Sequence, residues 1–101
     1  MKIDFSKVPV DLDGIPFTEK DVPVKVSSIA INALLATFPH EQALSGEDKL
    51  KRFTLAQRIK TNEKSVDISA EELALIKSLI GYGFPPLCVG AAYAILDPKG
   101  E

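Results

Sequence analysis

Between residues 27 and 96, apolar side chains recur every three or four positions along the chain, with polar side chains between them. This period places the apolar side chains on one side of a helix. Serines, which cap helix starts, precede three of the runs, and prolines or glycines, which end helices, follow most of them. The pattern therefore predicts four helices, near residues 28–38, 46–60, 70–81 and 86–96.

Local signals mark the ends of these helices. One of the two serines at 27–28 offers a hydroxyl cap for the first helix. Ser69 and Glu72 have the spacing of a capping box, so the third helix is expected to begin directly after Ser69. Gly81 and Gly83 are expected to end it in the left-handed conformation. The proline pair at 85–86 suits the start of the fourth helix.

The N-terminal quarter has a different pattern. Pro9, Pro16 and Pro23 lie seven residues apart among valine, isoleucine and phenylalanine, which opposes helix and suits extended segments. The Asp-Gly pair within residues 12–15 tolerates the positive φ angles of a tight turn, so a small β-hairpin is expected here. Residues 66–68 alternate like a short strand that could pair with this hairpin.

The predicted fold is therefore mainly α, in the α+β sense, with a four-helix core and a small N-terminal β-hairpin. Residues 1–101 are expected to form a single domain, with an extended arm over 1–26 and a helical core over 27–96. The core is expected to form around six side chains, which are Leu34, Phe53, Ile59, Leu73, Ile76 and Leu87.

The predicted helix at 86–96 is apolar nearly all round. Such a helix lies either at the centre of a domain or at a subunit interface. Its small residues would let a neighbouring helix approach closely. The candidates for self-association are Gly90, Ala91 and Ala94.

Composition narrows the setting of the protein. The chain has 101 residues, 46% of them hydrophobic and 26% charged, as in an ordinary globular protein. Its first residues carry acids and prolines where a signal peptide needs an apolar core, and its longest apolar run is too short to span a bilayer. One cysteine allows no intrachain disulfide. We therefore expect a cytoplasmic protein without a membrane partner.

Charge argues against a general affinity for nucleic acid, because the net charge is −2. Residues 45–64 are the exception, with six bases against three acids. Such a stripe could contact phosphates or an acidic partner, or it could be a solvated helix face with local pairs such as Asp48 with Arg52. The candidate contact residues are Lys49, Lys51, Arg52, Arg58 and Lys60.

Candidate catalytic groups are few. His40 and Cys88 are the single histidine and cysteine, His40 in an expected exposed connector and Cys88 in an apolar run where a thiol packs like a small hydrophobe. Paired carboxylates occur at 11 and 13, 47 and 48, and 71 and 72, where turns and helix starts explain them. Nucleotide-binding and nucleophile-elbow motifs are absent. We therefore expect a protein that is not an enzyme, with no catalytic, cofactor-binding or metal-binding residues.

Several of these features together resemble a group of small proteins encoded by bacteriophages and prophages. The matched features are an Asp-Leu-Asp-Gly turn at 11–14, the helix at 50–59, the segment 66–69, Glu72, Ile76-Lys77, a glycine-rich turn, Pro86-Leu87 and Val89-Gly90. The resemblance covers nearly the whole chain and implies a phage or prophage setting in a bacterial host cell. It carries over no catalytic residue.

The sequence thus favours a non-catalytic phage or prophage accessory protein that acts by binding another protein, with self-association through the helix at 86–96. The alternative is a small regulator that binds nucleic acid through the basic face of the helix at 46–60.

Overall fold

The computed structural model describes residues 1–39, 41 and 44–97. These residues form four helices, as predicted, and four strands of two residues each. The helices are α1 (Val26–Leu35), α2 (Gly46–Thr61), α3 (Ala70–Gly83) and α4 (Pro86–Leu96). The strands are β1 (Lys2–Ile3), β2 (Thr18–Glu19), β3 (Val22–Pro23) and β4 (Val66–Asp67). The fold is mainly α with a small β part, which confirms the predicted class.

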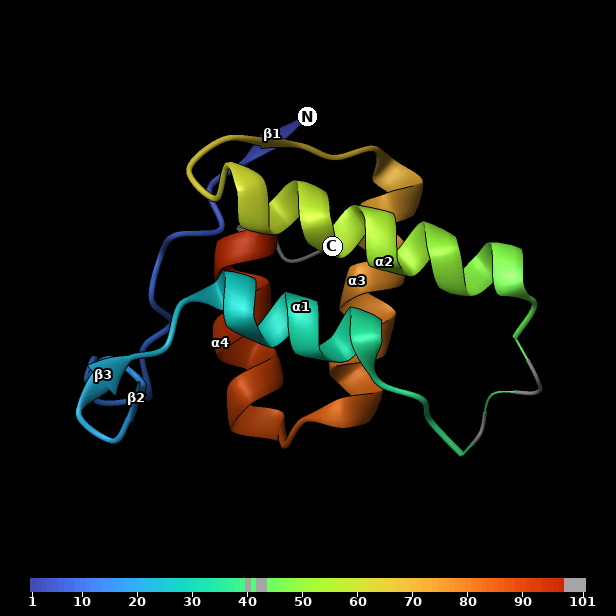
Figure 1. The fold of residues 1–101 in the computed structure, drawn as a ribbon. Coiled ribbons are helices and arrows are strands. Elements are labelled where there is room, and N and C mark those ends of the chain that lie inside the picture. The colour runs from blue at the N-terminus through green and yellow to red at the C-terminus, as the bar shows by residue number, and fades with distance from the viewer. Residues whose placement is uncertain (40, 42–43, 98–101) are drawn as a thin grey trace.

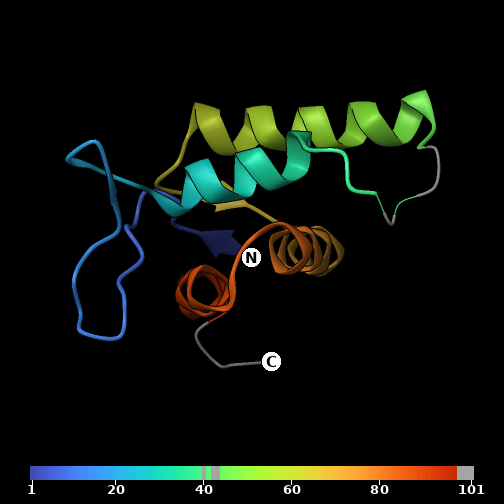
Figure 2. The same cartoon turned by 90° about the horizontal axis from the view of Figure 1, so that it is seen from below.

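The helices form two crossed layers (Figures 1 and 2). In one layer α1 and α2 run antiparallel to each other, and in the other α3 and α4 do the same. Figure 2 shows α3 and α4 nearly end-on beneath the first layer. Helix α1 packs against each of the other three helices, so α1 is the central helix of the fold.

The fourth helix was expected either at the centre of the domain or at a subunit interface. Because α1 is the central helix, the first of these alternatives is wrong. Helix α4 lies at the edge of its layer, and only Ala92 and Leu96 of its side chains are fully buried. Six residues of α1 are buried, and its alanines at 30 and 33 let the second layer approach closely.

The start of α1 also differs from the prediction. The helix begins at Val26 with no side-chain cap, because carbonyl groups of the N-terminal arm accept the first free amides. The amide of Val26 donates to the carbonyl of Lys7, and that of Ser27 to the carbonyl of Phe5. The hydroxyl of Ser27 donates instead to the carboxylate of Glu63, 2.7 Å away. A tertiary contact thus replaces the serine cap.

Four of the six predicted core residues are buried, namely Leu34, Ile59, Leu73 and Ile76. Phe53 and Leu87 are 49% and 47% exposed, so their assignment to the core was wrong. In α2 the apolar residues that predicted the helix recur at strict intervals of three, at Leu50, Phe53, Ala56 and Ile59. Each interval of three residues falls about 60° short of a full turn. Over the nine residues from Leu50 to Ile59 the shortfall reaches about 180°, so Leu50 points to solvent while Ile59 is buried.

The N-terminal arm forms two turns and two small sheets. The predicted turn at 12–15 exists, with a φ of 79° at Gly14 and a single bridge that pairs Val10 with Pro16. A second turn follows directly and joins β2 to β3 through two residues with positive φ, Lys20 and Asp21. Strand β4 pairs antiparallel with β1 and not with the hairpin, which corrects the predicted pairing.

The capping box at the start of α3 is confirmed. The amide of Glu72 donates to the Ser69 hydroxyl at 3.1 Å, and the amide of Ser69 donates to the Glu72 carboxylate at 3.0 Å. The helix continues through Gly81 and Gly83, so the expectation that these two glycines would end it in the left-handed conformation was wrong. Side chains at these positions would crowd their neighbours: a Cβ would lie 3.1 Å from the Tyr93 hydroxyl at position 81 and 3.0 Å from the Phe38 ring at position 83.

Candidate protein-interaction surfaces

The outward side of α4 carries four small or apolar residues in one line. Leu87, Gly90, Ala91 and Ala94 have the spacing i, i+3, i+4, i+7, which places them on one side of a helix. Gly90 and Ala94 are exposed, Leu87 is nearly half exposed and Ala91 is half-buried. The structure therefore brings the three predicted self-association residues together and adds Leu87 to them.

The turn of the N-terminal arm extends this surface. Val10 and Leu12 lie beside the start of α4, across a hollow of about 460 Å³. The Asp11 carboxylate accepts bonds from the amides of Asp13 and Ile15, both at 2.9 Å, and so fixes the turn. Leu12 projects from this turn with 95% of its surface exposed. We call the combined surface the α4 face: Val10, Leu12, Leu87, Gly90, Ala91 and Ala94.

Sequence reasoning missed half of this surface. Val10 was part of the predicted extended arm, Leu12 belonged to the predicted turn, and Leu87 was assigned to the core. The available signal was the position of Leu12 next to an Asp-Gly pair, because such turns project their side chains into solvent.

A polar cluster fixes the orientation of α4 against α3. The Lys77 ammonium lies 2.9 Å from the Asp97 carboxylate and 5.0 Å from the centre of the Tyr93 ring. The Tyr93 hydroxyl donates to the backbone carbonyl of Lys77. These contacts hold the inner side of α4 to the core and leave the α4 face outward.

The five basic residues proposed on α2 do not share one side of the helix. At about 100° per residue, Lys49, Arg52 and Lys60 lie on the side toward α1, whereas Lys51 and Arg58 lie on the opposite side. The basic residues thus border two different surfaces of the molecule.

Both arginines of α2 are already engaged by carboxylates. Arg52 binds Glu41 in a bidentate pair and is mostly buried. The alternative that placed Arg52 on a solvated helix face, paired with Asp48, was therefore wrong. Arg58 is more exposed and contacts both carboxylate oxygens of Glu72, at 2.9 and 3.0 Å. Burial raises the pKa of the Glu72 carboxyl, but the bonds from Ser69 and Arg58 outweigh it and hold the pKa below its ordinary value.

The lysines of α2 are less constrained. Lys51 lies 3.9 Å from Glu47 in an exposed pair of the i, i+4 type. Lys49 and Lys60 form no ion pair with any residue in the described part of the chain.

The structure also locates the single cysteine. Cys88 is half-buried in α4, and burial raises the pKa of its thiol, which favours the protonated and weakly nucleophilic form. His40 lies outside the described residues. Within residues 1–39, 41 and 44–97, no cluster of three or more His, Cys, Asp or Glu side chains could hold a metal ion.

The helices of the described segments are too short or too polar to cross a membrane. No family model, curated protein or solved structure matches the chain. The observations that bear on function are therefore the exposed apolar residues of the α4 face and the charges that border α2.

Proposed function

We propose that the chain is a non-catalytic accessory protein of a phage or prophage, that it acts by binding protein, and that it self-associates through the α4 face. The observation that carries the proposal is the exposed line of Leu87, Gly90, Ala91 and Ala94 with Leu12 projecting beside it. Apolar side chains gathered on an exposed surface mark sites of protein association more often than scattered ones do.

The absence of charge on α4 supports a symmetric pairing of two copies. Residues 86–96 contain no charged side chain, so two α4 helices can approach each other without bringing like charges together. Leu12 is almost fully exposed, and burying such a leucine completely in the interface contributes about 1.5–3 kcal/mol.

Gly90 supports the same interpretation. A glycine inside a helix costs about 1 kcal/mol relative to alanine. Apart from its chain neighbours and the nearby backbone of its own helix, no heavy atom lies within 4 Å of the position that a Cβ at residue 90 would take. Packing within the described protomer therefore does not require glycine there. A second helix packed closely against this position would require it.

The proposal is tested by a matched pair of substitutions. Ala94→Glu places a charge on the α4 face, and Ala74→Glu places the same charge on an exposed alanine of α3. We expect sedimentation to show a concentration-dependent dimer for the wild type and for Ala74→Glu, and a folded monomer for Ala94→Glu. A wild type that stays monomeric through the micromolar range, or an equal effect of the two substitutions, would overturn the proposal.

A further inference from the structure

A second apolar hollow lies between α1 and α2, on the exposed side of their layer. It measures about 410 Å³ and is lined by Ile31 and Leu35 from α1 and by Phe53 and Ala56 from α2, with polar residues at its rim. Leu35 and Phe53 are each about half exposed, although both are large and apolar. Their exposure shows that no other part of the described chain covers this apolar floor completely.

The hollow continues along the same side of α1. Leu35 also borders an adjoining hollow of about 270 Å³, whose lining includes Leu44, Lys49 and Arg52. The two hollows share Leu35 in their linings, and we call them together the α1–α2 groove. It runs from Lys60 at one end to Lys49 at the other.

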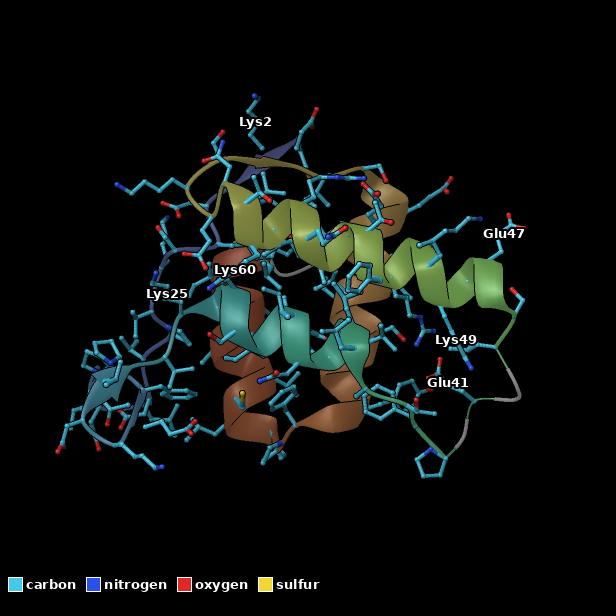
Figure 3. The ribbon with its side chains drawn as sticks, viewed as in Figure 1. Lys2, Lys25, Glu41, Glu47, Lys49 and Lys60 are labelled. Carbon is cyan, nitrogen blue, oxygen red and sulfur yellow. The ribbon has the colours of Figure 1, made fainter. Side chains whose placement is uncertain are left out.

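Both ends of the groove carry positive charge. Lys49 and Lys60 are eleven residues apart, which is about three helical turns, so they project from the same side of α2 with about 16 Å between them along the axis. Figure 3 shows both side chains on the side of α2 that faces α1, one toward each end of the groove.

The neighbouring acids do not cancel this charge. Glu63 is paired with Lys25 at 2.9 Å, and Glu41 is paired with Arg52. Helix α1 carries no charged residue. The charged residues that line the two hollows are Lys49, Arg52 and Lys60. Because Arg52 is paired with Glu41, the remaining charge of about +2 belongs to Lys49 and Lys60.

We propose that the α1–α2 groove binds an amphipathic helix of a partner protein, with apolar side chains on one side and acidic side chains about three turns apart. A helix suits the site because the walls are themselves two helices, whose backbone amides and carbonyls are already paired, so an extended segment finds no strand edge to join. The apolar side chains would cover Leu35 and Phe53, and the acids would meet Lys49 and Lys60.

A second copy of the chain does not supply such a helix. Helices α1 and α4 contain no acids, and the acids of α2 and α3 lie next to each other in the first turn, not three turns apart. The occupant is therefore expected to be a different protein. This inference deepens the proposed function, since it names a class of partner, and it uses a surface that shares no residue with the α4 face.

A displayed library of helical peptides, selected on the full chain, tests the inference. We expect the selected peptides to carry an apolar stripe with an acid near each end. The double variant Lys49→Glu/Lys60→Glu should lose about tenfold or more in affinity for them and should prefer peptides in which lysine replaces the acids. Lys51→Glu is the matched control, because Lys51 lies on the opposite side of α2 and should leave affinity unchanged.

Selected peptides without acids, an equal loss in Lys51→Glu, or no selection at all would overturn the inference. So would complete displacement of the peptides by a second copy of the chain. The measurement is repeated on Ala94→Glu, which should keep peptide binding, while the double lysine variant should keep self-association. The two variants thereby distinguish a loss of peptide binding at the groove from a loss of self-association through the α4 face. Circular dichroism confirms that each variant is folded.

Discussion

Arg52 donates from both terminal nitrogens of its guanidinium group to the two carboxylate oxygens of Glu41, at 3.1 and 2.5 Å. Each of the two side chains is only 11% exposed. The pair ties α2 to the segment that follows α1, and it does so on the side of α2 that borders the α1–α2 groove. Arg52 therefore has a structural role that its position in a basic stretch of sequence does not indicate.

The first prediction concerns this pair. Arg52→Ala should lower the free energy of unfolding by about 2–3 kcal/mol, because it leaves the poorly solvated Glu41 carboxylate without its bidentate partner. Lys51→Ala should lower the free energy of unfolding by less than about 0.5 kcal/mol, since its pair with Glu47 is largely exposed to solvent. Urea unfolding measures both, and equal losses would contradict the structural role of Arg52.

The second prediction concerns acid stability. Hydrogen bonds from Lys25 and Ser27 hold the pKa of the Glu63 carboxyl below its ordinary value. Because the folded-state pKa is lowered, this stabilisation is fully present above the unfolded-state pKa and is lost as the pH falls through the folded-state value.

Glu63→Gln should therefore lower the free energy of unfolding by about 1 kcal/mol at neutral pH, and this difference from the wild type should shrink in acid. Urea unfolding between about pH 7 and pH 3 measures this difference. Glu19→Gln, at an exposed position in β2, is the control and should follow the wild type. A gap for Glu63→Gln that stays constant down to the lowest pH would refute the linkage.

The third prediction separates two phenylalanines. Phe5, in the N-terminal arm, is fully buried, and Phe5→Ala should lower the free energy of unfolding by about 3–5 kcal/mol. Phe53→Ala should cost about 1 kcal/mol or less, because half of that side chain is already in solvent. Thermal or urea unfolding of the two variants should give this order, and the reverse order would place Phe53 in the core.

The fourth prediction compares two glycines inside helices. Gly90→Ala should stabilise the protomer by about 1 kcal/mol, since a Cβ there meets open space. Gly81→Ala should give no gain, because its Cβ would crowd the Tyr93 hydroxyl that bonds to Lys77. Unfolding is measured at low protein concentration so that association does not contribute, and a gain at residue 81 equal to that at residue 90 would count against the packing of α3 on α4.

Local signals predicted the helices well, while tertiary contacts decided what local signals could not. Ser69 and Pro86 mark helix starts through bonds and geometry within a few residues, and both helices begin where expected. The start of α1 depends instead on carbonyl groups of Phe5 and Lys7, about twenty residues away in the chain. No local pattern contains that information.

The candidate surfaces, too, could be predicted only where the local sequence determines them. The small residues Gly90 and Ala94 indicated a helix contact from the sequence alone, and the structure places both on the exposed side of α4. Leu12 could not be assigned to that surface, because its place beside α4 depends on how the N-terminal arm folds back. The basic residues of α2 were predicted to form one face because they are close together in the sequence. At about 100° of rotation per residue, however, they point to two different sides of the helix.

Self-association through the α4 face is tested most directly by a dilution series of the isotope-labelled wild-type chain, followed by backbone amide resonances. We predict concentration-dependent shifts at Leu87, Gly90, Ala91 and Ala94 and in the turn around Leu12, with the amides of the α1–α2 groove unchanged. Resonances that do not move across the micromolar to millimolar range, or shifts confined to residues outside the α4 face, would contradict the account.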